Sequence, residues 1–170
     1  VGHHTLNHDE PQIARTGVTV ILPRGGKIWH DFVFAGFHSL NGCGEMTGVH
    51  WINEAGLLTT PIAITNTHDV GLAHHALVRY GIEKELMGIF TLPVVAETYD
   101  GWLNDEKSHI EESHVWEAIE SASSGAVAEG CVGGGTGMTC HEFKGGIGTS
   151  SRIIETKSGL YRVKALTEIA

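Results

Sequence analysis

The stretch Val94-Val95-Ala96-Glu97-Thr98-Tyr99-Asp100-Gly101 is the most informative part of the chain, because an apolar strand in it runs directly into a carboxylate and a phenol. Side chains alternate between the two faces of a strand, so Glu97 and Tyr99 are expected to share a face. There the carboxylate can hold an ammonium group, and the phenol can donate a hydrogen bond to a developing oxyanion or orient a nucleophile. The alternative is a surface strand that turns at Asp100-Gly101, a common turn pair. Spacing alone favours this second interpretation.

Two other apolar runs, residues 16–23 and 61–66, are predicted to be buried strands, as are residues 92–97. Residues 161–169 alternate between apolar and polar side chains and predict a last strand. The sequence stops in or just after that strand, so we expect a partner segment to be missing and the chain to be incomplete at its C-terminus.

Two helices are predicted between these strands. The first follows Asp69 as its N-cap and ends at Gly81. The second runs from His114 to about Ala122 and is capped by Ser113. Strands and helices are therefore mixed, and the predicted fold class is α+β in a single domain that spans residues 1–170.

Composition excludes several classes of function. The chain has 170 residues and a net charge of −9, with no basic run that would bind a phosphate backbone, so nucleic acid is excluded as a partner. No apolar run approaches the roughly 20 residues that cross a bilayer, so no membrane partner is expected. The three cysteines form no CxxC pair, which favours a reducing compartment. We expect a cytoplasmic protein, or a periplasmic one if a signal peptide has been removed.

Glycines cluster at Gly133-Gly134-Gly135-Thr136-Gly137. Successive backbone N–H groups there could cradle an anion, but the cluster lacks the lysine and the spacing of a phosphate loop. A close approach of the backbone to substrate or to another strand is as well supported as a simple turn. Residues 144–152 carry serines beside basic residues but no GxSxG or SxxK motif, so a turn or an interface loop is predicted.

Twelve histidines raise the question of a metal site. None has ligand spacing, HExxH is absent, and adjacent His74 and His75 would point about 100° apart on a helix. A histidine of the helix core is the favoured interpretation of His74.

Together, several separated blocks resemble, in the same order, the DmpA-like L-aminopeptidase D-Ala-esterase/amidase and β-peptidyl aminopeptidase family. The blocks are residues 17–19, 39–48, 64–68, 95–101, 103–105, 129–138 and 143–152. The resemblance covers nearly the whole chain and corresponds to the N-terminal, larger part of such a protein.

This resemblance implies a four-layer α/β/β/α sandwich, of which this chain is the larger part. It implies a precursor that cuts itself before a serine or threonine, which then becomes the nucleophile of a separate, smaller β-chain. The implied substrate is a short peptide, amide or ester with a free amino terminus, and no metal or organic cofactor is implied. Family members tend to assemble as tetramers of processed heterodimers.

The resemblance also assigns roles to individual residues. Glu97 resembles the carboxylate that binds the substrate's ammonium group, and Tyr99 resembles the catalytic tyrosine beside the nucleophile. Gly133, Gly134 and Gly135 resemble a glycine-rich segment that borders the substrate. The family's oxyanion asparagine is missing from the last residues, 167–170. A non-catalytic scaffold or truncated member, and a related N-acyltransferase, are the alternatives.

Overall fold

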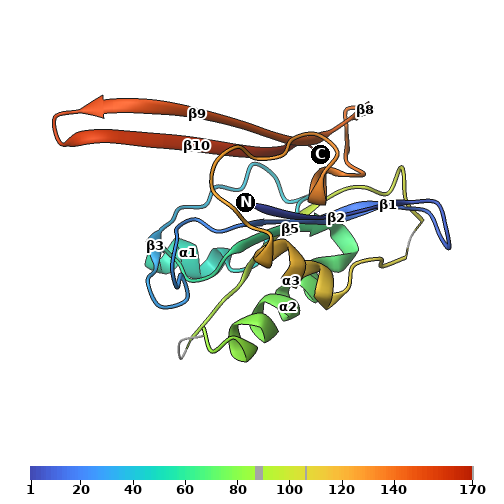
Figure 1. The fold of residues 1–170 in the computed structure, drawn as a ribbon, viewed down its shortest axis with the longest axis horizontal. Coiled ribbons are helices and arrows are strands. Elements are labelled where there is room, and N and C mark those ends of the chain that lie inside the picture. The colour runs from blue at the N-terminus through green and yellow to red at the C-terminus, as the bar shows by residue number, and fades with distance from the viewer. Residues whose placement is uncertain (87–89, 106, 170) are drawn as a thin grey trace.

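A four-stranded sheet forms the centre of the protein, whose computed structural model describes residues 1–86, 90–105 and 107–169 (Figure 1). The strand order is β1-β2-β5-β6, in which β1/β2 and β2/β5 are antiparallel and β5/β6 is parallel. The bounds are Gly2–His8 for β1, Ala14–Ile21 for β2, Ile62–Asn66 for β5 and Val94–Thr98 for β6. The three predicted buried strands are thus confirmed as β2, β5 and β6, with small shifts at their ends.

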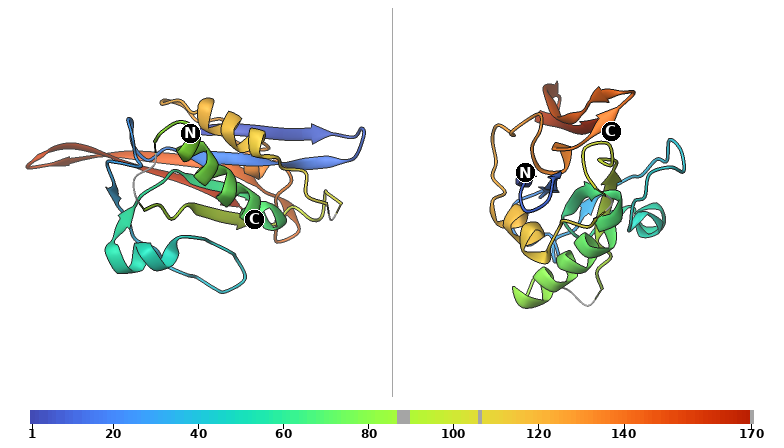
Figure 2. Two further views of the ribbon diagram at one scale, coloured as in Figure 1. Left: turned by 90° about the horizontal axis from the view of Figure 1, so that it is seen from below. Right: turned by 90° about the vertical axis from the view of Figure 1, so that its right-hand side faces the viewer.

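Two helices, α2 (Val70–Glu83) and α3 (Glu112–Glu120), cover one face of the sheet (Figure 2). α2 connects the parallel strands β5 and β6, as a parallel pair requires. The second predicted helix is confirmed as α3, whose Val115, Ala118 and Ile119 are all buried in the core. Trp116 joins the two helices through a hydrogen bond from its Nε1 to the carbonyl oxygen of Ala76, at 3.1 Å.

The opposite face of the sheet carries a long hairpin of β9 (Gly146–Thr156) and β10 (Gly159–Ile169), as Figure 1 shows. The short 3₁₀ turn η2 (Gly133–Gly135) contacts β1, β2 and β5 on one side and β9 and β10 on the other. Helices, sheet and hairpin thus make three successive layers in this chain. The strand predicted over residues 161–169 is confirmed as part of β10.

Smaller elements complete the described fold. α1 (Val49–Ala55) lies between two glycines with positive φ, Gly48 and Gly56. The remaining short elements are β3 (Val33–Phe34), β4 (Leu57–Leu58), η1 (Thr67–Asp69), β7 (Thr139–Cys140) and β8 (Phe143–Lys144).

Both predicted helix boundaries need correction. Gly81 does not end α2, which continues to Glu83, because Gly81 is buried and packs as an ordinary helical residue. Ser113 lies inside α3 rather than before it. The N-cap is Glu111. Its side chain accepts a hydrogen bond from the backbone N–H of His114, and Nδ1 of the His114 ring accepts one from the backbone N–H of Glu111 at 3.0 Å.

The turn or loop predicted over residues 144–152 is also wrong, since most of that range belongs to β9. Glycine and serine have low strand propensity, but β9 pairs with β10 along its whole length, from Gly146↔Ile169 to Thr156↔Gly159. Backbone hydrogen bonds to the neighbouring strand override the local preference.

Asp69 precedes α2 as predicted, yet its side chain does not cap the helix. Instead the buried carboxylate accepts hydrogen bonds from Asn66 Nδ2 at 2.7 Å, from Ser108 Oγ and from the backbone N–H of Ile110 at 3.4 Å. This network joins the end of β5 to the segment that leads into α3.

We expect Asp69→Ala to lower the free energy of unfolding by about 3 kcal/mol, because it leaves several buried donors unpaired. Denaturant unfolding of the full-length protein measures this. Asp31→Ala is the control, since Asp31 is exposed and pairs with the exposed Arg24, and it should cost under about 1 kcal/mol. Equal losses in the two variants would contradict the role of the network.

Candidate active site

The carboxyl ends of the parallel strands β5 and β6 meet at one edge of the sheet, where Thr65 pairs with Glu97 and Asn66 with Thr98. Ligands of parallel sheets commonly bind at this end. A cavity of about 350 Å³ opens there. Most of its lining residues are polar: Thr16, Asn66, Thr67, His68, Tyr99, Asp100, Gly101, Asn104, Asp105, Lys107 and His109.

Glu97 lies near the carboxyl end of β6; it is not one of the residues that line the cavity, but its neighbour Thr67 is. Its Oε2 accepts a hydrogen bond from Thr67 Oγ1 at 2.6 Å, and its backbone N–H donates to the carbonyl oxygen of Glu45 at 3.0 Å. Gly44 lies beside Oε1, since a Cβ on this glycine would be 3.4 Å from that atom. The carboxylate is half-buried and positioned on both sides, and it keeps lone pairs for an ammonium donor.

Tyr99 lies one residue beyond the end of β6, so strand alternation alone does not position it. Its side chain lines the cavity and is 52% exposed. The ring folds over Gly101, where an added Cβ would lie 2.6 Å from the hydroxyl oxygen. The hydroxyl is thus placed by local chain geometry and remains accessible to a ligand in the cavity.

Asp100 and Asn104 make the segment after β6 more than a surface turn. Asn104 donates from Nδ2 to the carbonyl oxygens of Arg15 (2.8 Å) and Asp100 (3.0 Å), and its Oδ1 accepts from the N–H of Arg15 at 2.6 Å. Asp100 is buried, which raises the pKa of its carboxyl group, although the Thr16 hydroxyl opposes that rise. The amide of Asn104 therefore fixes this segment against β2.

Gly133, Gly134 and Gly135 are buried in η2 and pack against several strands. A Cβ on Gly133 would lie 2.4 Å from Thr19 Oγ1, so the close approach to a strand is confirmed. Their N–H groups donate to Thr5 Oγ1, Thr19 Oγ1 and a backbone carbonyl oxygen, respectively. These amides are engaged within the fold, and a direct role of the three glycines in binding substrate stays a prediction.

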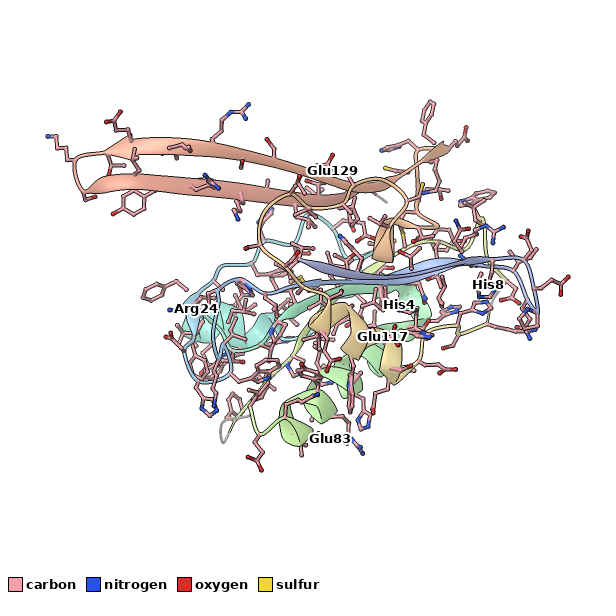
Figure 3. All side chains as sticks on the ribbon, in the orientation of Figure 1. His4, His8, Arg24, Glu83, Glu117 and Glu129 are labelled. Carbon is pink, nitrogen blue, oxygen red and sulfur yellow. The ribbon has the colours of Figure 1, made fainter. Side chains whose placement is uncertain are left out.

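Histidines were considered as metal ligands. In the described part of the chain, no group of three or more His, Cys, Asp or Glu side chains is arranged to hold a metal ion. His4 instead stacks on His114, with 4.3 Å between the ring centroids, and pairs with Glu117 at 2.8 Å (Figure 3). His74 is half-buried, and burial lowers its pKa.

Another acidic residue of this region, Glu168, was not predicted from the sequence. It lies on β10, and its Oε1 accepts a hydrogen bond from Thr98 Oγ1 at 3.0 Å. A polar residue in an alternating strand is ordinary, so the sequence carried no signal for this contact between residues 70 positions apart.

None of the described helices is both long enough and apolar enough to cross a membrane. The three cysteines are free.

Comparison with known protein families matches residues 1–169 to Peptidase family S58. Two curated relatives are beta-peptidyl aminopeptidases BapA. The protein of Sphingosinicella microcystinivorans is 48% identical over 155 residues, which cover 91% of this chain and 39% of the relative. The protein of Sphingosinicella xenopeptidilytica is 47% identical over 178 residues, which cover 99% of this chain and 44% of the relative. The chain thus spans less than half the length of these relatives.

Three solved structures have a similar fold. A beta-aminopeptidase of Burkholderia sp. has a TM-score of 0.92 and 54% identity, covering 99% of this chain and 48% of that one. The L-aminopeptidase D-Ala-esterase/amidase of Ochrobactrum anthropi has a TM-score of 0.88 and 43% identity, covering 97% and 49%. The PH0078 protein of Pyrococcus horikoshii OT3 has a TM-score of 0.89 and 41% identity, covering 97% and 50%. The Ochrobactrum enzyme is described as a variant of the Ntn-hydrolase fold, so the expected α+β fold is confirmed.

Proposed function

Because this chain belongs to peptidase family S58, we propose that it forms the substrate-binding part of an aminopeptidase or amidase. The substrate is a short peptide, amide or ester with a free amino terminus. The nucleophile is a serine or threonine hydroxyl at the start of a separate, smaller chain, and residues 1–170 form the larger partner in one domain. The names of the curated relatives favour an N-terminal β-amino acid in the substrate.

The position of Glu97 carries this proposal. A carboxylate held by Thr67 at the carboxyl end of β6 can bind a primary ammonium group without rearranging. Such an ion pair orients the substrate and discriminates against a blocked amine, since the site would then face an uncharged group. Glu97 is therefore the residue that selects a free amino terminus.

Tyr99 supplies the second group of the site. Its accessible hydroxyl lines the cavity and can donate a hydrogen bond to the oxygen that becomes negative when the substrate carbonyl is attacked. The partner chain's hydroxyl attacks that carbonyl and loses its proton to a base, and the leaving amine or alcohol takes up a proton. Water then hydrolyses the ester that joins the acyl group to the partner chain and restores the partner's hydroxyl.

Mass spectrometry and a paired assay on the full-length gene product test this proposal. We expect two chains, the smaller beginning with Ser or Thr, and hydrolysis of the p-nitroanilides of L-alanine, D-alanine or β-alanine. The N-acetylated forms of the same substrates are the control and should react far more slowly. A single uncut chain that releases no nitroaniline would support the scaffold alternative instead.

A further inference from the structure

A second carboxylate, that of Glu168, lies on the hairpin side of the sheet. Side chains alternate along β6, so Thr98, its hydrogen-bond donor, leaves the strand on the face opposite to Glu97. Gly134 of η2 makes room for the carboxylate. A Cβ at Gly134 would lie 2.9 Å from Oε1 and 3.0 Å from Oε2, so a larger residue there would displace the group.

One oxygen of Glu168 is buried without a donor. Thr98 satisfies Oε1, whereas Oε2 has no hydrogen-bond partner within residues 1–86, 90–105 and 107–169. Asp100 is 9% exposed and lines the cavity, and within the same residues its Oδ2 also has no partner. Buried polar atoms are normally paired, because leaving them unpaired costs free energy. Each of these oxygens is therefore suited to accept a hydrogen bond from a group outside this chain.

The charges around Glu168 favour a cation as that group. Burial raises the pKa of Glu168 from 4.5 to about 7; the Thr98 hydroxyl opposes the rise, Asp100 adds to it and Lys144 opposes it. Lys144 does not neutralise the carboxylate, since its Nζ donates to the carbonyl oxygens of Gly135 (3.1 Å) and Gly145 (2.7 Å). The glycines of η2 add no titratable group.

We propose that Glu168 is a second ammonium-binding carboxylate of this site, on the face of β6 opposite to Glu97. The inference deepens the proposed function and rests on it. The ligand is the primary ammonium group at the first residue of the partner chain, because the substrate's single terminal amine cannot reach both Glu97 and Glu168 on opposite faces of β6. An ammonium ion donates the hydrogen bond that Oε2 lacks and neutralises the charge that burial disfavours.

The pH profile of kcat/KM for an aminoacyl p-nitroanilide tests Glu168, because this parameter reports ionisations of the free enzyme. Only the ionised carboxylate attracts an ammonium group, so kcat/KM should fall tenfold per pH unit below the pKa of Glu168. Glu168→Gln keeps the shape of the side chain but cannot ionise. We expect it to lower the plateau about tenfold or more and to remove this acidic limb.

Substitutions of two residues near Glu168 should shift the midpoint of the acidic limb of the pH profile in opposite directions. Thr98→Val removes the hydroxyl that stabilises the ionised form, so the midpoint should rise in pH. Asp100→Asn removes a negative charge, so the midpoint should fall. A merely structural role for Glu168 predicts neither shift. An unchanged profile in Glu168→Gln, or shifts in the reverse directions, would overturn the inference.

The choice of substrate tests this source of the ammonium group. Because the group belongs to the enzyme itself, Glu168→Gln should slow a free aminoacyl p-nitroanilide and an N-blocked ester alike. A loss confined to the substrate with a free amine would place the substrate's own amine at Glu168 and overturn the inference. A wild-type protein without activity would refute the proposed function only. Calorimetry with methylammonium chloride then tests Glu168, because equal binding by the wild type and Glu168→Gln would refute the second site.

Discussion

Glu97→Gln in the assembled, processed protein should lower kcat/KM for substrates with a free amine about 10- to 100-fold, mainly through a higher KM. Glutamine preserves the hydrogen bond from Thr67 but lacks the charge that pairs with an ammonium group. A hydrogen bond to a charged group contributes about 1.5–3 kcal/mol, which gives this range. Steady-state kinetics with an aminoacyl p-nitroanilide measures the loss.

Two comparisons make this result specific. An ester without an amino group should be hydrolysed at nearly the same rate by the wild type and Glu97→Gln. Glu83→Gln is the matched control, because α2 begins just after the carboxyl end of β5, where the site lies, and Glu83 is the last residue at the other end of this helix (Figure 3). It should leave both rates unchanged. Equal losses for free and blocked substrates in Glu97→Gln would count against ammonium binding.

Gly137→Ala should be strongly destabilising, with a loss of about 3 kcal/mol and a correspondingly lower Tm. The added Cβ would lie 1.8 Å from the carbonyl oxygen of Arg15 and 3.0 Å from Asn104 Nδ2. Either the segment after η2 moves away from β2 or the hydrogen bonds of Asn104 to Arg15 break. Thermal unfolding of the full-length protein measures the change.

Gly148→Ala provides the control for this prediction. Gly148 lies in β9, and a Cβ there would meet no atom within 4 Å. Alanine at that position should be neutral or slightly stabilising, since it reduces the conformational freedom of the unfolded chain. If both alanine variants unfolded at the same temperature, the close packing around Gly137 would not be a source of stability.

Local sequence patterns predicted three of the four central strands, because burial and β-branching act over a few residues; β1 was not predicted, since its sequence, GHHTLNH, is mostly polar. The runs that became β2, β5 and β6 are rich in apolar and β-branched residues, and most of their residues are buried. The predicted ends of the helices were wrong because tertiary packing and capping set them. Gly81 and Ser113 resemble terminators in isolation, but burial of Gly81 and the reciprocal cap between Glu111 and His114 set the real boundaries.

In the candidate site, the positions of Glu97 and Tyr99 could be predicted from the sequence, but the contacts of Glu168 and Asn104 could not. Glu97 and Tyr99 follow an apolar strand in the sequence itself, so their place at one end of the sheet was predictable. Glu168 reaches Thr98 only because the hairpin returns over the sheet, and Asn104 fixes Asp100 only because it bonds to β2. Such contacts depend on the tertiary fold and leave no local pattern.

A crystal structure of the processed protein with a non-hydrolysable β-amino acid amide tests the central claim most directly. We expect the amine nitrogen within hydrogen-bonding distance of the Glu97 carboxylate, with the amide carbonyl facing both Tyr99 and the partner chain's terminal hydroxyl. An amine bound away from Glu97, or a partner hydroxyl remote from this end of β6, would contradict the proposed site.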